Sequence, residues 1–144
     1  MVGEGQTLTY EMCEVAHRCI ASGAGLICAS VAYLVPPDGG PRPGCGAIVA
    51  LLETASAKKA YHFGKPYPFM MRAARKRVGL VTDEITMIGD TMETDIRAAT
   101  DLRFCSVLVL TGTTERTHLA DCLYHSNTIV ESIAQLLLLA AVTI

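Results

Sequence analysis

The chain has 144 residues, of which 51% are hydrophobic and 18% are charged, and its formal net charge is −2. This length and hydrophobic content predict about one globular domain with a substantial core, and they exclude a disordered chain. The weakly acidic balance lacks the basic surface that nucleic acids and anionic membranes attract, so we expect neither of these as a partner.

Cysteine usage and the chain ends bear on the cellular compartment. The six cysteines form no CxxC pair, and several lie inside apolar runs, where a reduced thiol packs as a small hydrophobic group. This favours free thiols and a cytoplasmic location over a disulfide framework. Residues 1–10 lack the basic and apolar regions of a signal peptide, and the apolar stretch 133–144 is too short to span a bilayer.

Helical and strand-like patterns alternate along the first part of the chain. Apolar residues at helical spacing predict a helix over 8–22, and the apolar run 23–35 predicts a strand. Residues 36–44 contain four of the six prolines and are a predicted loop. A second helix is expected over 45–60, followed by a short strand or extended link over 61–64.

The same alternation continues to the end of the chain. A proline in the first turn and Gly79 after the last turn favour a helix over 66–80. Further strands are predicted over 85–89, 105–112 and 128–130, and further helices over 92–102, 115–123 and 132–140. Strands that are apolar throughout and alternate with helices are typical of a parallel sheet covered on both faces, so we predict an α/β fold.

An acidic pair follows the strand predicted over 85–89. Asp90 ends that strand, where the ligand crevice of an open parallel sheet lies, and Asp95 comes about one and a third helical turns later. Two carboxylates supplemented by water are a usual way to hold Mg²⁺. The alternative is that Asp90 or Thr91 only caps the helix that Asp95 continues.

A second candidate site is the stretch GKPYP, residues 64–68. Gly64 allows a close backbone approach, Lys65 supplies a mobile cation, and Pro66 is expected to start a helix whose positive end favours anions. Together these features could bind a phosphoryl group. The alternative is a lysine that is only a solvated surface charge.

These two stretches, in this order and about 25 residues apart, resemble the third and fourth motifs of the haloacid dehalogenase (HAD) superfamily of phosphatases. The resemblance is to the branch of NagD-like nucleotide and p-nitrophenyl phosphatases, and it covers roughly residues 10 to 138. The segments that carry it are PGCGAIVALLETASAKKA, GKPYPFM, MIGDTMETDI, VLVLTGTTERTHL and IVESIAQL.

The resemblance implies a Rossmann-like doubly wound core and a two-step phosphoryl transfer through an aspartyl-phosphate, with Mg²⁺ as cofactor and a small phosphorylated metabolite as substrate. By position, Lys65 would stabilise the phosphate and the nucleophile, Asp90 would ligate Mg²⁺, and Asp95 would assist the metal or its water shell. It also implies that residues 1–60 are the C-terminal part of a cap domain and residues 61–144 the C-terminal half of the core.

The sequence departs from the family pattern at the nucleophile. The family's first motif is a strand that ends in DxD, and no two of the six aspartates here are two positions apart. Ser30 has the local look of the second motif, but by alignment it falls where the cap ends. The residues after it, Val31, Ala32 and Tyr33, replace the usual Asn, Pro and Asp.

Two later positions also carry expectations. Leu102 and Arg103 replace the family's usual Ala-Gly turn, and a non-glycine residue would strain that turn if a positive φ is required. Residues 112–115, GTTE, have an N-cap signature in which Thr113 or Thr114 precedes Glu115, so we interpret them as capping the next helix.

The chain thus looks like the second half of a HAD-type phosphatase, and we expect it to be inactive alone. A cut core exposes sheet edges, which favours pairing with a missing N-terminal half or a homo-oligomer. The alternative is a catalytically inactive HAD-like fragment that binds metal, phosphate or another protein. A receiver-type binding domain is a third possibility, but its acidic cluster on the first strand is absent.

Overall fold

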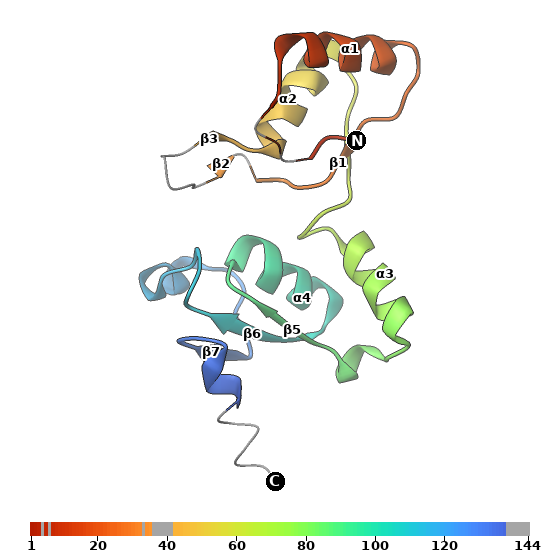
Figure 1. Cartoon of the computed structure of the whole chain (residues 1–144). Helices are drawn as coiled ribbons and strands as arrows, with labels where there is room; N and C mark the ends of the chain where they lie inside the picture. Colours follow the sequence, from red (N-terminus) through yellow and green to blue (C-terminus); the bar gives the residue numbers. More distant parts are fainter. Residues whose placement is uncertain (4, 6, 33, 36–41, 138–144) are drawn as a thin grey trace. The chain divides into compact units, whose positions relative to one another are not determined.

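The computed structural model describes residues 1–3, 5, 7–32, 34–35 and 42–137. The chain divides into two compact units, which we call unit 1 (Met1–Gly64) and unit 2 (Lys65–Ile144) and describe separately (Figure 1). Among the described residues, no helix is both long and apolar enough to cross a membrane.

Unit 1 is built on two helices. Helix α1 (Tyr10–Ala21) begins where the hydroxyl of Thr9 accepts a hydrogen bond from the backbone N–H of Met12, at 3.2 Å. Helix α2 (Cys45–Ser56) follows Gly44. The predicted helices over 8–22 and 45–60 are therefore both present, each somewhat shorter than expected.

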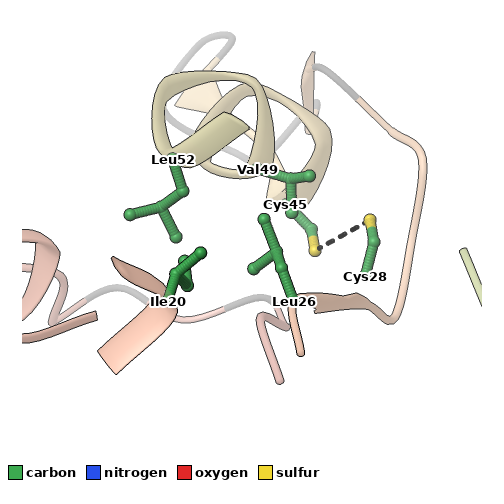
Figure 2. Close-up of a cluster of buried hydrophobic side chains, with 6 residues drawn as sticks. All are labelled: Ile20, Leu26, Cys28, Cys45, Val49 and Leu52. Atoms are coloured by element: carbon green, nitrogen blue, oxygen red, sulfur yellow. Dashed lines mark hydrogen bonds between the residues drawn. The ribbon is translucent and has the colours of Figure 1, made fainter. Parts of the chain in front are cut away.

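A small apolar cluster between these helices and the first strand forms the core of unit 1, as Figure 2 shows. Its buried members are Ile20, Leu26, Cys28, Cys45, Val49 and Leu52. Within it, the Sγ atoms of Cys28 and Cys45 lie 3.9 Å apart as free thiols. Burial of both thiols fits the interpretation that they pack as hydrophobic groups.

The strands of unit 1 are shorter than predicted. Strand β1 (Ile27–Cys28) pairs in parallel with β4 (Tyr61–His62), whereas β2 (Leu34–Val35) pairs antiparallel with β3 (Arg42–Pro43). The prediction of one strand over 23–35 was therefore wrong. The predicted loop contains β3 near its end, and its residues 36–41 lie outside the described part.

Two local interactions break the run between β1 and β2. The hydroxyl of Ser30 accepts a hydrogen bond from the N–H of Ala32, a local bond that competes with strand pairing. The carbonyl of Ala32 then accepts from the N–H of Gly46 in the first turn of α2, at 2.9 Å. A Cβ at Gly46 would lie 2.6 Å from the Val31 carbonyl oxygen, so this close approach requires glycine.

Unit 2 begins with the lysine segment and a helix. Helix α3 (Pro68–Val78) is preceded by Tyr67 at the N-cap and followed by Gly79 in the left-handed region, with φ 73°. Pro68 therefore occupies the first helical position, and the prediction that Pro66 starts this helix was wrong. A short 3₁₀ turn, η1 (Thr82–Glu84), leads into the sheet.

The sheet of unit 2 is parallel, in the order β5-β6-β7, with β5 at Thr86–Gly89, β6 at Cys105–Val109 and β7 at Thr128–Val130 (Figure 1). Side chains alternate across β6: Leu108 packs in one buried cluster with Met92 and Ile96, while Val107 and Val109 pack in another with Val130. Strand β6 is thus covered on both faces, and the predicted α/β class with parallel strands is confirmed.

The helices that connect these strands differ in detail from the prediction. The segment predicted as a helix over 92–102 is a π-helical turn, η2 (Met92–Ile96), that continues as helix α4 (Arg97–Leu102). The segment 115–123 forms a 3₁₀ helix, η3 (Arg116–Asp121), in place of an α-helix. Of the last predicted helix, residues 134–137 are helical and residues 138–140 lie outside the described part.

Candidate phosphate and metal site

The acidic loop begins where β5 ends. Asp90 directly follows Gly89, the last residue of the strand, and so lies at the carboxyl edge of the parallel sheet. Its Oδ2 atom accepts a hydrogen bond from the backbone N–H of Thr113 at 3.2 Å, and its carbonyl accepts from the N–H of Thr114 at 3.2 Å. Among the described residues, the Oδ1 atom of Asp90 has one long contact, 3.4 Å from the Thr91 hydroxyl.

Asp95 is a buried carboxylate whose oxygens all have partners. Its exposed fraction is 3%, and its Oδ1 lies 2.6 Å from Nζ of Lys65. Its Oδ2 accepts from the backbone N–H groups of Asp90 and Thr91, each at 3.3 Å. A buried charge needs such pairing to offset the loss of its hydration. Asp95 therefore joins the lysine segment to the acidic loop.

The π-helical turn and a glycine allow Asp95 to reach back to the end of β5. The carbonyl of Thr91 accepts from the N–H groups of both Asp95 and Ile96, which widens the first turn of the helix. A Cβ at Gly89 would lie 2.3 Å from Cβ of Asp95, so a larger residue there would displace the aspartate. The sequence spacing predicted that Asp95 returns to this edge, but not that its carboxylate turns to the lysine and the backbone.

Lys65 follows a constrained glycine, and its side chain is partly exposed. It follows Gly64, where a Cβ would lie 1.9 Å from the carbonyl oxygen of Ala29, so only glycine fits at that position. The Lys65 side chain is 38% exposed. An ammonium group has three donors, and among the described residues Asp95 accepts from one of them, so the others can donate to an anion.

The loop after β6 contributes contacts that the sequence reasoning did not foresee. Thr114 is buried, and its hydroxyl accepts a hydrogen bond from the N–H of Met92 at 3.1 Å. Thr114 thus caps the helix that follows Asp90, and the prediction that this stretch caps the next helix was wrong: η3 has no side-chain cap. The carboxyl ends of adjacent parallel strands meet at one edge of the sheet, and this rule could have predicted from the sequence that the loop after β6 lies beside Asp90.

The donor set fits Mg²⁺ only in part. Asp90 offers Oδ1, while both oxygens of Asp95 have hydrogen-bond partners. Over the part of the chain that the structure describes, no group of three or more His, Cys, Asp or Glu side chains could hold a metal. Mg²⁺ is commonly bound by one or two carboxylates together with water and substrate phosphate. The residues present therefore fit an ion that takes its other ligands from water, a phosphate or another segment.

The family model of HAD-hydrolase-like proteins matches residues 62–136. The chain is 31% identical to a dihydroxyacetone phosphatase of Corynebacterium glutamicum (strain R), over 94% of its own length and 50% of that protein. It is 30% identical to the ribonucleotide monophosphatase NagD of Escherichia coli (strain K12), over 94% of its own length and 53% of that protein.

The solved structure of a p-nitrophenyl phosphatase from Archaeoglobus fulgidus matches with a TM-score of 0.87 and 26% identity, over 96% of this chain and 55% of that one. The chain thus spans about half the length of the proteins that it matches. Sequence and structure agree that this chain belongs to the HAD-like hydrolases, in the branch of NagD and the p-nitrophenyl phosphatases.

Proposed function

We propose that this chain supplies the lysine and the acidic loop of a Mg²⁺-dependent phosphomonoester hydrolase that acts on small phosphorylated metabolites. The observation that carries the proposal is the 2.6 Å bond between Lys65 and Asp95, because it fixes a cation next to the loop that holds Asp90. Dihydroxyacetone phosphatase and ribonucleotide monophosphatase are the names of two relatives, which supports this class of substrate.

Each site residue has a distinct role in this proposal. Lys65 neutralises negative charge on the phosphoryl oxygens, and Asp95 positions the lysine. Asp90 holds Mg²⁺ through Oδ1; when bound, the ion neutralises charge on the phosphate and helps to orient it. That Asp95 also assists the metal stays a prediction, since both of its oxygens already accept hydrogen bonds.

The nucleophile is the part that this chain does not supply. Its six aspartates include no DxD pair, and we propose that a segment equivalent to the remaining half of the relatives provides that pair. Among the strands described in unit 2, β5 pairs only with β6, so backbone groups on its other edge are available to an added strand. In this proposal residues 1–60 are the end of a cap domain and residues 61–144 are half of the core.

Ligand binding by the purified chain tests the site independently of turnover. We expect inorganic phosphate with Mg²⁺ to shift the backbone amide NMR signals of Lys65, Asp90 and Thr91. In Lys65→Met the response to phosphate should be lost, and in Asp90→Asn the response to Mg²⁺. Lys59→Met, at an exposed lysine, is the matched control for loss of one positive charge. Equal responses in Lys65→Met and Lys59→Met would rule out the assigned phosphate site.

A second candidate function is a HAD-like module that binds metal, phosphate or another protein without catalysis. The missing DxD pair favours it. The coding sequence immediately upstream of Met1 separates the two candidates. A strand that ends in DxD there supports the enzyme, whereas its absence, together with retained ligand binding, supports the binding module.

A further inference from the structure

We propose that the loop after β6, residues 112–114, is a positioning element for Asp90, with Thr114 as its principal positioning residue. This inference rests on the proposed function, because it concerns how Asp90 is presented to a cation. It adds a segment that neither the lysine motif nor the acidic motif contains. The segment is more than twenty positions away from Asp90 in the sequence; two hydrogen bonds join it to Asp90 and a third joins it to Met92.

The hydrogen bonds of the loop hold Asp90 and the residue two positions later. The N–H of Thr113 donates to Oδ2 of Asp90, and the N–H of Thr114 donates to its carbonyl, both at 3.2 Å. The hydroxyl of Thr114 accepts from the N–H of Met92 at 3.1 Å. The backbone before and after the turn is thus tied to one loop, which fixes where the Asp90 side chain leaves the chain.

Because Thr114 and Met92 are buried, loss of the hydrogen bond between them would be costly. Thr114 is 6% exposed and Met92 is 2% exposed, so water cannot readily replace the hydroxyl if it is removed. An unsatisfied buried N–H is costly, and the turn would have to move to satisfy it. Movement of Met92 would carry Asp90 with it, since only one residue separates them.

Gly112 sets the position of the carboxylate by its lack of a side chain. A Cβ built there would lie 1.8 Å from Oδ2 of Asp90 and 2.5 Å from its Cβ and Cγ. Rotation of the Asp90 side chain would move Oδ2 and Cγ away but would leave Cβ in place, so the backbone at Asp90 or Gly112 would have to move as well. The backbone of Gly112 does not have a positive φ, so alanine there meets no unfavourable φ, and its effect comes from the displacement of Asp90.

The consequence is a carboxylate with two unlike oxygens. Oδ2 accepts a hydrogen bond from the N–H of Thr113 at 3.2 Å, whereas within the described part of the chain Oδ1 has the 3.4 Å contact with the Thr91 hydroxyl and no other. The loop therefore presents Asp90 to a cation through Oδ1 alone. Groups that orient a metal-binding carboxylate typically change metal affinity 10- to 100-fold when they are mutated.

The test compares Thr114→Val, which keeps the shape but removes the acceptor, with Thr114→Ser, which keeps the hydroxyl. Gly112→Ala is a second variant that displaces the carboxylate directly. Thr117→Val is the matched control, because Thr117 is exposed and, among the described residues, its hydroxyl has a single long contact, 3.5 Å from Glu115. For each full-length variant, we would measure the ¹³C shift of the Asp90 carboxyl group, amide exchange at Met92, and Mn²⁺ affinity from solvent proton relaxation.

We expect Thr114→Val to shift the Asp90 carboxyl resonance, to speed exchange at Met92 by about tenfold or more, and to weaken Mn²⁺ binding by about tenfold. Gly112→Ala should shift the Asp90 resonance and weaken Mn²⁺ binding, while Thr114→Ser and Thr117→Val stay near wild type. An unchanged Asp90 resonance in both Thr114→Val and Gly112→Ala overturns the inference. If the wild-type chain binds no Mn²⁺, the proposed metal role fails, and the Asp90 resonance still decides the role of the loop.

Discussion

Removal of the charge on Asp95 tests the link between the lysine segment and the acidic loop most sharply. In Asp95→Asn the side-chain amide keeps its size, and its oxygen can still accept from the backbone N–H groups of Asp90 and Thr91. Its NH₂ group then faces the ammonium of Lys65, where two donors meet and the ion pair is lost. The variant thus isolates the contribution of the charge.

The magnitude follows from the burial of the two partners. Breaking a fully buried ion pair costs about 3–5 kcal/mol, whereas an exposed pair contributes about 0–1 kcal/mol. Asp95 is almost fully buried, but the Lys65 side chain is 38% exposed, so solvent screens part of the interaction. We therefore expect a free-energy loss of about 1–2 kcal/mol for unit 2, between these limits.

The assay is urea denaturation of the wild type, Asp95→Asn, Lys65→Met and the double variant. The chain contains no tryptophan, so methyl NMR signals of Val107, Leu108 and Val130 would report the unfolding of unit 2. The double-mutant cycle should give a coupling energy of about 1 kcal/mol. Strictly additive effects would refute the view that this ion pair holds the site together. Lys59→Met, at an exposed lysine, should leave the midpoint near that of the wild type.

Four further predictions concern the backbone, a thiol and the metal ligand. Arg103 has φ 58°, a backbone conformation that strains a non-glycine residue. Arg103→Gly should therefore raise the free energy of unfolding of unit 2 by about 0.5–1 kcal/mol in urea titrations. A lower free energy of unfolding would contradict this interpretation. Burial, with the neighbouring Cys45, raises the pKa of the Cys28 thiol from 9.0 to about 11. Iodoacetamide at pH 8 should therefore modify Cys28 far more slowly than the exposed Cys19, which peptide mass spectrometry would show. Equal rates of modification would refute this prediction. The raised pKa also means that this thiol's contribution to stability is complete below pH 9 and is lost as the pH rises through 11, which base titration of unit 1 would reveal. Asp90→Asn should weaken Mn²⁺ binding while leaving the free energy of unfolding of unit 2, from urea titrations, within about 1 kcal/mol of the wild type. Unchanged Mn²⁺ binding would exclude Asp90 as a ligand.

Elements with a strong local signal were predicted from the sequence. Helix α3 was recognised by the proline near its start and by Gly79 after its end, and both lie where the chemistry of helix ends requires them. The parallel strands β5 and β6 were recognised because both are apolar along their length. The concern about Arg103 was also justified, since that residue does adopt a positive φ.

Features that depend on partners distant in the sequence were not predictable from local pattern. The apolar run 23–35 indicates a single strand, yet Ser30 and the first turn of α2 break it. Thr114 has the signature of a local cap, but its hydroxyl is used by Met92 on another segment. In the site, spacing could bring Asp95 near Asp90, while the direction of its carboxylate depends on Lys65, thirty positions earlier.

The central claim is that this chain carries the charged groups of a phosphatase site but not its nucleophile. The most direct test is p-nitrophenyl phosphate hydrolysis by the purified 144-residue chain with Mg²⁺, measured beside Asp90→Asn. Our account predicts no hydrolysis above the blank in either protein, because no DxD pair is present to accept the phosphoryl group. Hydrolysis by the wild type that is lost in Asp90→Asn would contradict the account and would show that another residue of this chain acts as the nucleophile.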